Sequence, residues 1–258
     1  MLTSWNGLAI GGLARAYVAT GAEEHLRLAD GAADFLRAKL SDGSGRKLLH
    51  RWRDGDAAIA GMADDYAYLA QGLVDLYEAA FDPARLSWAL ELAEEAVKRF
   101  GAPGGGVYLT AQGAAPELIA RAIEDPDGVE PAPSSVLADV CLRLHELTGR
   151  APLRAFADAT LERFGGRLAE RPSALPYMAC ALDRALGPSR VVVIAGLDLP
   201  GGTEMLKAVR AKLRPGAGVA AFTAKTSAAT AALLPAAAGM TLGKKARAYL
   251  CQDGACGL

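Results

Sequence analysis

The sequence has few cysteines, a near balance of charges and no long hydrophobic run. Its 258 residues include four cysteines, too few for a disulfide-rich scaffold in a chain of this length. The formal net charge is −1, from 28 Lys and Arg against 29 Asp and Glu. This balance gives no electrostatic reason to expect a nucleic acid or an anionic membrane as a partner. The composition therefore favours a small molecule or another protein.

A membrane-spanning segment is not expected, because such a helix needs roughly 18 apolar residues in a row. The alanine-rich stretch 227–240 is broken by Pro235 and Gly239. Met1-Leu2 is followed at once by Thr3-Ser4-Trp5-Asn6, without the basic and apolar regions of a signal peptide. The hydrophobic content of 52% is enough for a substantial core. We expect a cytoplasmic protein that needs no metal or cofactor.

An internal repeat gives the clearest structural signal. The segments 25–36, 89–100 and 153–164 align without gaps at an offset of 64 residues each time. Apolar residues recur in each segment at i, i+1, i+5 and i+8, which is one stripe along a helix. The matched positions are Leu28, Leu92 and Phe156; Ala29, Ala93 and Ala157; Ala33, Val97 and Leu161; and Leu36, Phe100 and Phe164.

Each repeated helix follows another amphipathic helix across a short turn. The turns are Thr20-Gly21, Phe81-Asp82-Pro83 and Thr148-Gly149. Glycine readily ends a helix, and proline readily begins one. The sequence therefore predicts three helical hairpins, and a seventh helix over about 174–186 opens a fourth. The long links 45–60 and 103–132 contain short strand-like pieces at 47–49 and 107–109.

The pattern changes near Ser189, where the apolar run 191–196 predicts a buried strand. A helix over 201–213 and strands over 219–222 and 246–251 are expected to follow. The predicted fold is mainly α, a partial (α/α)6 toroid of repeated hairpins in residues 1–188. A small α/β appendage in residues 189–258 completes the chain.

Four short motifs together carry a family resemblance. They are Leu-Thr-Ser-Trp-Asn-Gly-Leu at 2–8, Arg-Trp-Arg-Asp-Gly at 51–55, Gly-Met-Ala-Asp-Asp-Tyr-Ala at 61–67 and Tyr-Leu-Cys-Gln at 249–252. In this order they resemble the YyaL-type family of thioredoxin-domain-containing proteins, which is related to the spermatogenesis-associated thioredoxin-like protein of animals. The resemblance covers nearly the whole chain.

The resemblance implies a six-hairpin, glycosidase-like toroid, similar in fold to N-acylglucosamine 2-epimerase and several glycoside hydrolases. In the family this toroid follows a thioredoxin-like domain, and that domain and the first hairpins are absent from this chain. We therefore expect open ring ends that bind a partner, either the missing part of the polypeptide or a second copy. Where the family tends to have Pro-Ser-Gly-Asn-Ser, residues 131–135 read Pro-Ala-Pro-Ser-Ser, so the amide is missing.

Polar and aromatic residues lie where the inner helices are expected to begin. The free N–H groups at these helix starts and the positive ends of the helix dipoles face one opening of the toroid, which we call the mouth. One interpretation is a saccharide site, in which Trp5, Trp52 and Tyr66 stack on a sugar ring. Asn6 and Arg51 would then bind hydroxyl groups.

Asp65, with its neighbour Asp64, is the candidate general acid or base of such a site. Glu130 and Ser134 are expected at the same mouth. A glycosidase needs a second carboxylate across the pocket, and Glu130 or Asp54 could supply it. Glycosidase-like or epimerase-like catalysis is therefore a hypothesis.

Helix capping is the alternative explanation for the same residues, because Ser, Asp and Asn are preferred N-caps. Ser4, Ser134 and Ser173 fit this role, and one of Asp64 and Asp65 is expected to be a cap. Trp5 and Trp52 also fit a hydrophobic core. The histidines, His25, His50 and His145, are interpreted as bystanders.

Cys251 and Cys256 form a C-x4-C pair. The spacing matches neither a C-x-x-C redox motif nor a full zinc ligand set. Two free thiols, a reversible disulfide, and redox exchange with a thioredoxin-like domain all remain open. Cys141 and Cys180 are expected to be small buried hydrophobic residues.

Overall fold

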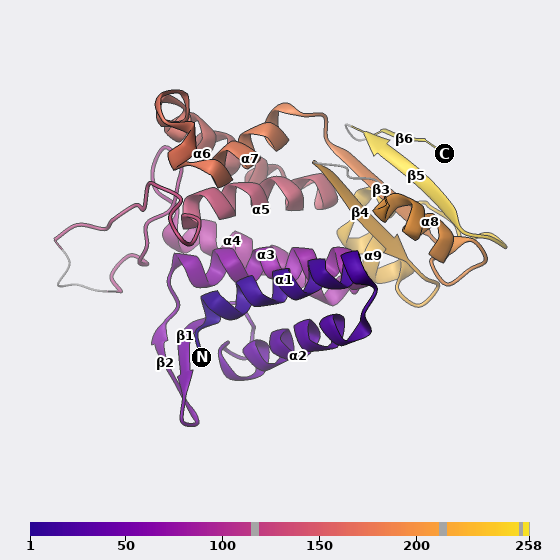
Figure 1. The fold of residues 1–258 in the computed structure, drawn as a ribbon, viewed down its shortest axis with the longest axis horizontal. Helices are drawn as coiled ribbons and strands as arrows, with labels where there is room; N and C mark the ends of the chain where they lie inside the picture. The colour runs from indigo at the N-terminus through magenta and orange to yellow at the C-terminus, as the bar shows by residue number, and fades with distance from the viewer. Residues whose placement is uncertain (115–118, 212–215, 253–254, 258) are drawn as a thin grey trace.

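The computed structural model describes residues 1–114, 119–211, 216–252 and 255–257. Within these ranges, helices are joined in pairs by short turns, and a seventh helix opens a fourth pair after a 3-10 turn, η1 (Pro172–Ala174) (Figure 1). The helices are α1 (Thr3–Thr20) with α2 (Glu23–Lys39), α3 (Ala63–Ala80) with α4 (Pro83–Phe100), α5 (Pro133–Thr148) with α6 (Ala151–Glu170), and α7 (Pro176–Leu186).

The turns within the hairpins follow from their residues. Gly21 and Gly149 adopt φ values of 72° and 70°, a left-handed conformation that glycine takes without steric cost. In the second turn Phe81 adopts φ 59°, and the Asp82 carboxylate accepts the Ala84 N–H at 2.9 Å. Asp82 is therefore the N-cap of α4, and Pro83 starts that helix without needing a donor.

The helices form two layers. In one layer α3 packs against α1 on one side and α5 on the other, and α7 packs against α5. The repeated segments 25–36, 89–100 and 153–164 lie on α2, α4 and α6, each packed on its hairpin partner. Their stripe positions Leu36, Phe100 and Phe164 are buried. The arrangement is the predicted series of hairpins.

The contact between α1 and α3 is a backbone contact. A Cβ atom added at Gly72 would lie 2.3 Å from the carbonyl oxygen of Gly7, and one added at Gly7 would lie 2.5 Å from Leu69 N. Two glycines facing each other thus allow the helices to touch without side chains between them. The distance between α1 and α3 depends on both residues.

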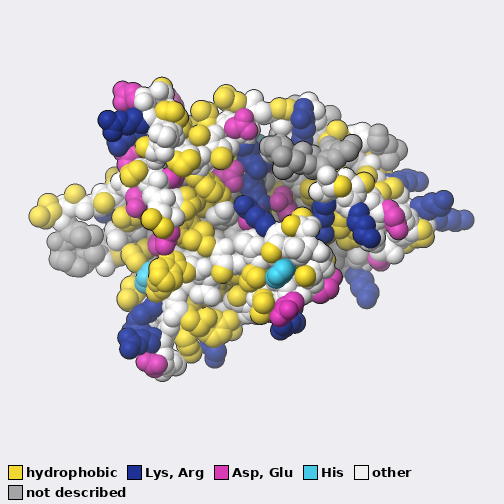
Figure 2. Space-filling model, in the orientation of Figure 1, with side chains coloured by type: hydrophobic (Ala, Val, Ile, Leu, Met, Phe, Trp, Pro, Cys, Tyr) yellow, Lys and Arg dark blue, Asp and Glu magenta, His cyan; other side chains and the backbone are white. Residues whose placement is uncertain are grey.

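Charged side chains join the inner helices farther from the mouth. Arg143 on α5 pairs with Asp75 at 2.7 Å and Glu78 at 2.8 Å, both on α3. Asp75 also binds Arg15 of α1 at 2.9 Å. Figure 2 shows basic and acidic side chains gathered between α1 and α5 on this face. Buried ions are costly without partners, so this network fixes the order of the three helices.

The link between α2 and α3 forms the hairpin of β1 (Leu49–Arg53) and β2 (Asp56–Ala60). Its turn is Asp54-Gly55, and both residues have positive φ, as a tight two-residue hairpin turn requires. β1 also meets the start of the chain through a bridge between Leu2 and Arg51. In the second link Val107 forms an isolated bridge with Gly101 instead of the strand expected over 107–109.

The last quarter of the chain contains a sheet with strand order β4-β3-β5-β6. β3 and β4 are parallel, and β5 runs antiparallel to β3. The expected strands are present, and the helix expected over 201–213 is present as α8 up to Arg210, with residues 212–213 outside the described ranges. The elements α9, η2 and β6 were not foreseen. The bounds are β3 (Arg190–Ala195), α8 (Gly202–Arg210), β4 (Ala217–Phe222), α9 (Ser227–Leu233), η2 (Pro235–Ala237), β5 (Arg247–Gln252) and β6 (Ala255–Gly257).

The sheet and the helices share one hydrophobic core, which includes Val193, Phe222 and Cys251 beside residues of α3 and α5. Arg210 of α8 donates hydrogen bonds to the carbonyl oxygens of Glu78 and Ala79, at 3.2 and 2.7 Å. These hydrogen bonds give donors to two carbonyl groups at the C-terminal end of α3, which have no partner within the helix. A division of the chain at residue 188 stays a prediction. In the parts of the chain described, every helix is too short or too polar to cross a membrane.

Replacing Gly72 with alanine should destabilise the fold by roughly 1–3 kcal/mol, because the new methyl group would overlap the α1 backbone. The control is Gly12→Ala on α1, where an added Cβ meets nothing within 4 Å. There the higher helix propensity of alanine should stabilise by about 0.5–1 kcal/mol. Urea unfolding of both variants measures the difference. Equal stabilities would contradict the close approach.

Candidate functional site

Asp65, in the first turn of α3, holds the starts of two helices. One carboxylate oxygen accepts the N–H of Ser4 in α1 at 2.9 Å, and the other accepts the N–H of Met62 at 2.9 Å. His50 of β1 donates from Nδ1 to the same carboxylate at 2.9 Å. The Asp65 side chain is fully buried, with 0% of its surface exposed. One carboxylate thus links α1, α3 and β1.

The environment of Asp65 shifts its protonation. Burial raises its pKa to about 6, and the negative charge of Asp64 adds to this rise. The Met62 N–H and His50 act in the opposite direction, because they stabilise the ionised form. Asp65 therefore titrates in a range where an ordinary aspartate is already ionised.

The capping of α1 and α5 differs from the expectation for Ser4 and Ser134. Leu2 occupies the N-cap position of α1 and has no side-chain oxygen, so the distant Asp65 caps that helix. Ser134 Oγ instead accepts the Val107 N–H at 3.0 Å and holds the preceding loop. Ser173 lies in the short 3-10 turn η1.

A second distant aspartate caps the start of α7. The Asp127 carboxylate accepts the N–H groups of Tyr177 and Met178 at 2.8 and 3.2 Å, and that of Ala132 at 2.8 Å. Asp127 lies three residues before Glu130 in the same link. It therefore fixes the loop that brings Glu130 to the mouth of the helices.

A cavity of about 390 Å³ opens at this mouth. We call it the acidic cavity, because Asp64, Glu124 and Glu130 line it together with Tyr68. Asp64 and Tyr68 are four residues apart on α3, so both point from the same face of the helix. The hydroxyl of Tyr68 donates to the Pro131 carbonyl oxygen at 2.6 Å, which joins α3 to the Glu130 loop.

The carboxylates of the acidic cavity influence one another. Burial raises the pKa of Asp64, and the charge of Glu130 raises it further, although neighbouring backbone N–H groups and His50 oppose the rise. Burial and the charges of Asp64 and Glu130 also raise the pKa of Glu124. A raised pKa makes a carboxyl group better suited to the role of a general acid.

Trp5 lies at the rim of the acidic cavity. Its indole N–H donates to the Glu130 carboxylate at 2.7 Å, and 59% of its surface is exposed. Asn6, next to it, donates from its amide to the Leu2 carbonyl oxygen at 2.6 Å and is half-buried. The structure therefore brings Trp5, Glu130 and Asp64 to one place, with Asn6 beside them.

The other expected ligand-binding residues lie away from the acidic cavity. Trp52 packs edge-on against Phe35 of α2, with ring centroids 5.8 Å apart. Arg51, also in β1, pairs with Asp56 of β2 at 3.5 Å. The interpretation of Trp52 as core packing fits its position better than a pocket wall.

Tyr66 requires a correction. Its side chain is fully buried, and its hydroxyl accepts the Leu48 N–H and an Arg99 N–H, each at 3.0 Å. The ring packs on Phe100 of α4, with centroids 5.2 Å apart. Tyr66 therefore lies on the side of α3 that faces α4, where a sugar cannot stack on it. Ser134 is equally buried and serves the loop described above.

Several residues of the site were not identified from the sequence. His50 was interpreted as a bystander, yet it contacts Asp65. Its place directly after the predicted strand-like piece 47–49 was an available but weak signal. Tyr68 was hidden in the apolar pattern of α3, and Glu124 and Asp127 lie in a link without regular structure.

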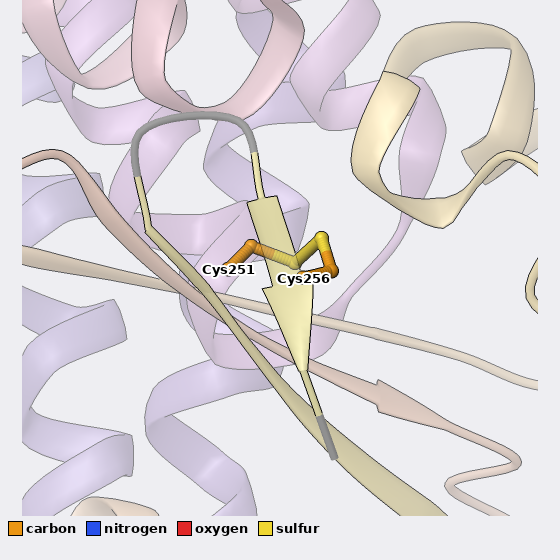
Figure 3. The surroundings of a disulfide bond; sticks show 2 residues. All are labelled: Cys251 and Cys256. Carbon is orange, nitrogen blue, oxygen red and sulfur yellow. A yellow bond between two sulfur atoms is a disulfide. The ribbon is translucent and has the colours of Figure 1, made fainter.

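Cys251 and Cys256 form a disulfide between β5 and β6 (Figure 3). Cys251 is buried, and Cys256 is exposed. The remaining two cysteines differ from each other: Cys141 is buried as expected, whereas Cys180 is exposed and corrects the expectation of burial.

Comparison with known proteins identifies relatives over most of the chain. No family model matches it. Spermatogenesis-associated protein 20 of mouse and of rat are each 34% identical over 205 residues, 76% of this chain and 26% of theirs. An uncharacterized protein of Caenorhabditis elegans is 33% identical over 219 residues. The chain thus spans about a quarter of the length of the mammalian relatives.

Two solved structures share the fold. A sugar epimerase from a ruminal bacterium aligns with a TM-score of 0.51 at 16% identity, covering 61% of this chain and 42% of the epimerase. A GH76 alpha-mannanase of Bacteroides thetaiotaomicron aligns with a TM-score of 0.50 at 18% identity, covering 64% and 44%. Such low identity shows the fold alone, which is the (α/α) toroid of helical hairpins.

Replacing Asp65 with asparagine should lower the unfolding free energy at pH 7 by roughly 1–3 kcal/mol, because the amide leaves one buried N–H without an acceptor. It should also remove a pH dependence. The folded pKa of about 6 exceeds the unfolded value of 3.8, so this group stabilises the fold fully below 3.8 and loses that contribution as pH rises to about 6.

Urea unfolding at several pH values between 4 and 7 measures both effects of the Asp65 substitution. The matched variant is Asp64→Asn, which keeps the caps. It should lower the pKa of Asp65, because it removes the neighbouring negative charge, and so should shift the pH dependence downward. An Asp65→Asn protein with wild-type stability and the same pH profile would contradict the capping role.

Proposed function

The chain belongs to the thioredoxin-domain-containing family of spermatogenesis-associated protein 20, and we propose that its toroid part binds a carbohydrate in the acidic cavity. The observation that carries the proposal is the meeting of Asp64, Glu130 and Tyr68 with the exposed Trp5 at the starts of the inner helices. An aromatic ring beside several carboxylates can contact both the apolar face and the hydroxyl groups of a sugar.

The dimensions of the acidic cavity support a small ligand. Its volume of about 390 Å³ lies within the range of sites for small molecules. The two fold neighbours are named as a sugar epimerase and a mannanase. This analogy of fold adds to the proposal and would not carry it alone.

The chemistry proposed for the site assigns different tasks to the adjacent aspartates. Asp64, with its raised pKa and its place in the cavity wall, is the proton donor. Glu130 supplies the second carboxylate, held by Trp5. Asp65, which is fully buried, positions Asp64 by fixing the first turn of α3. Hydrolysis or epimerisation of a sugar requires such an acid and base pair.

A thermal-shift screen tests the proposal with glucose, mannose, N-acetylglucosamine, glucuronate and the disaccharides of mannose and glucose. A sugar at about 100 times its dissociation constant should stabilise the fold by about 2.7 kcal/mol. Asp64→Asn and Trp5→Ala should each abolish that shift. The control is Asp54→Asn, an exposed carboxylate in the β-hairpin turn, which should keep it. A folded protein that responds to none of these sugars would refute the proposal.

A second candidate function is a non-catalytic interaction module, favoured by the outer face of α1. Trp5, Ala9, Gly12 and Ala19 recur at helical spacing on one face and are exposed. The surface over α1 in Figure 2 is mostly backbone and apolar atoms. Small residues lie on this face, as they do on the face that α1 presents to α3, so a further helix can pack closely against it. The mammalian relatives, which are about three times as long, have additional chain to supply it.

If this face binds a helix, the isolated chain should associate with itself through it at high concentration. Gly12→Glu should then abolish the association, because it places a charge in the contact. An added Cβ at Gly12 meets nothing within 4 Å, so the fold should tolerate the change. Gly31→Glu on α2, equally open, is the control. Light scattering after size-exclusion chromatography decides; a concentration-independent monomer would exclude self-association through α1.

A further inference from the structure

A second cavity, of about 590 Å³, lies where the sheet meets the helices. We call it the interface cavity. Its wall includes Gly149 and Arg154 from the α5–α6 turn and α6, Ala236 of η2, Val191 of β3, and both Cys251 and Cys256. The disulfide therefore borders a space large enough for a small molecule. The acidic cavity shares none of these residues.

The β5–β6 hairpin holds the two cysteines together. Cys251 and Cys256 are directly opposite in the antiparallel register, between the pairs Leu250–Gly257 and Gln252–Ala255. Backbone pairing on both sides of the bridge keeps the two side chains adjacent when the sulfur–sulfur bond is open. The disulfide can therefore form again without a rearrangement of the backbone.

The two sulfur atoms have different surroundings. Cys251 is 5% exposed and belongs to the shared hydrophobic core, whereas Cys256 lies on the edge strand and is exposed. An incoming thiolate reaches Cys256 more easily and displaces Cys251. The guanidinium of Arg154, which also binds Asp158 at 2.8 Å, lies in the same cavity wall. Arg154 thus brings a positive charge to this wall, and Glu146, which also lines it, brings a negative one.

We propose that the Cys251–Cys256 bridge is a reversible redox site that exchanges with a small-molecule thiol in the interface cavity. This inference is independent of the carbohydrate proposal, because it uses other residues and another cavity. A purely structural bridge is the alternative. The two differ in whether the folded protein admits a reductant to the bridge.

The exchange proceeds in two balanced steps. A first thiolate attacks Cys256 Sγ, a mixed disulfide forms, and the electron pair of the broken bond leaves on Cys251 Sγ as a thiolate. A second thiolate attacks the small-molecule sulfur of the mixed disulfide, and Cys256 leaves as a thiolate. Two small thiols are thereby oxidised to one small disulfide, and the protein gains two thiols. A small disulfide reverses both steps.

The first experiment follows reduction of the intact chain by reduced glutathione, with alkylation and mass spectrometry as the readout. The folded chain should be reduced within about tenfold of the rate in urea, because the bridge is accessible. Ala236→Phe, which fills the interface cavity, should slow reduction of the folded chain by about tenfold. Ala238→Phe, at an exposed position outside the cavity wall, is the control and should leave the rate unchanged.

The second experiment traps the mixed disulfide with oxidised glutathione. Cys251→Ser leaves the exposed Cys256, which should take up one glutathione. Cys256→Ser leaves the buried Cys251, which should take up about tenfold less. Exposed Cys180 reports the reactivity of a thiol outside the cavity in the same samples.

Two results would overturn the proposal. One is reduction of the folded wild-type chain that is slower than in urea by about a hundredfold or more, which marks a protected structural bridge. The other is equal glutathione uptake by the two serine variants. If either serine variant fails to fold, as circular dichroism would show, the wild-type and Ala236→Phe rates decide the question.

Discussion

The buried carboxylate of Asp65 is the interaction on which the mouth of the helical part depends. It accepts N–H groups from the starts of α1 and α3, and it holds His50 of the β-hairpin. Because a helix start has donors without partners, one acceptor shared by two helices sets them at the same level. That shared level places Trp5 of α1 beside the cavity lined by Asp64 of α3.

The same principle recurs one hairpin farther on. Asp127 lies in an irregular link, and its carboxylate caps α7 and accepts the Ala132 N–H before α5. Neither aspartate sits at the N-cap position of the neighbouring helix that it caps. The caps are therefore tertiary contacts, and they form when the hairpins assemble. This arrangement makes the positions of the cavity carboxylates a property of the whole helical part.

The sequence predicted the hairpins because their signals are local. The repeated apolar stripe marks α2, α4 and α6, and Gly21 and Gly149 mark the turns. The site depended on longer distances. Ser4 and Asp65 are 61 residues apart, and no local pattern shows that they meet. Asp64, Asp65 and Tyr66 are consecutive, and each helical residue turns by about 100°, so one lines the cavity, one caps and one faces α4. Choosing among them required the neighbours of α3.

Arg210 of α8 has a consequence for cooperativity. Its guanidinium binds the last carbonyl oxygens of α3, whose first turn is held by Asp65. The central helix of the hairpin series is thus secured at one end by the helical part and at the other by the α/β part. The change in composition near residue 189 marks the transition from helical hairpins to α/β structure. Separating the two parts there would take the Arg210 donor away from the carbonyl oxygens of Glu78 and Ala79 and would expose core residues on both sides. Evolution could therefore vary either part only within what the other tolerates.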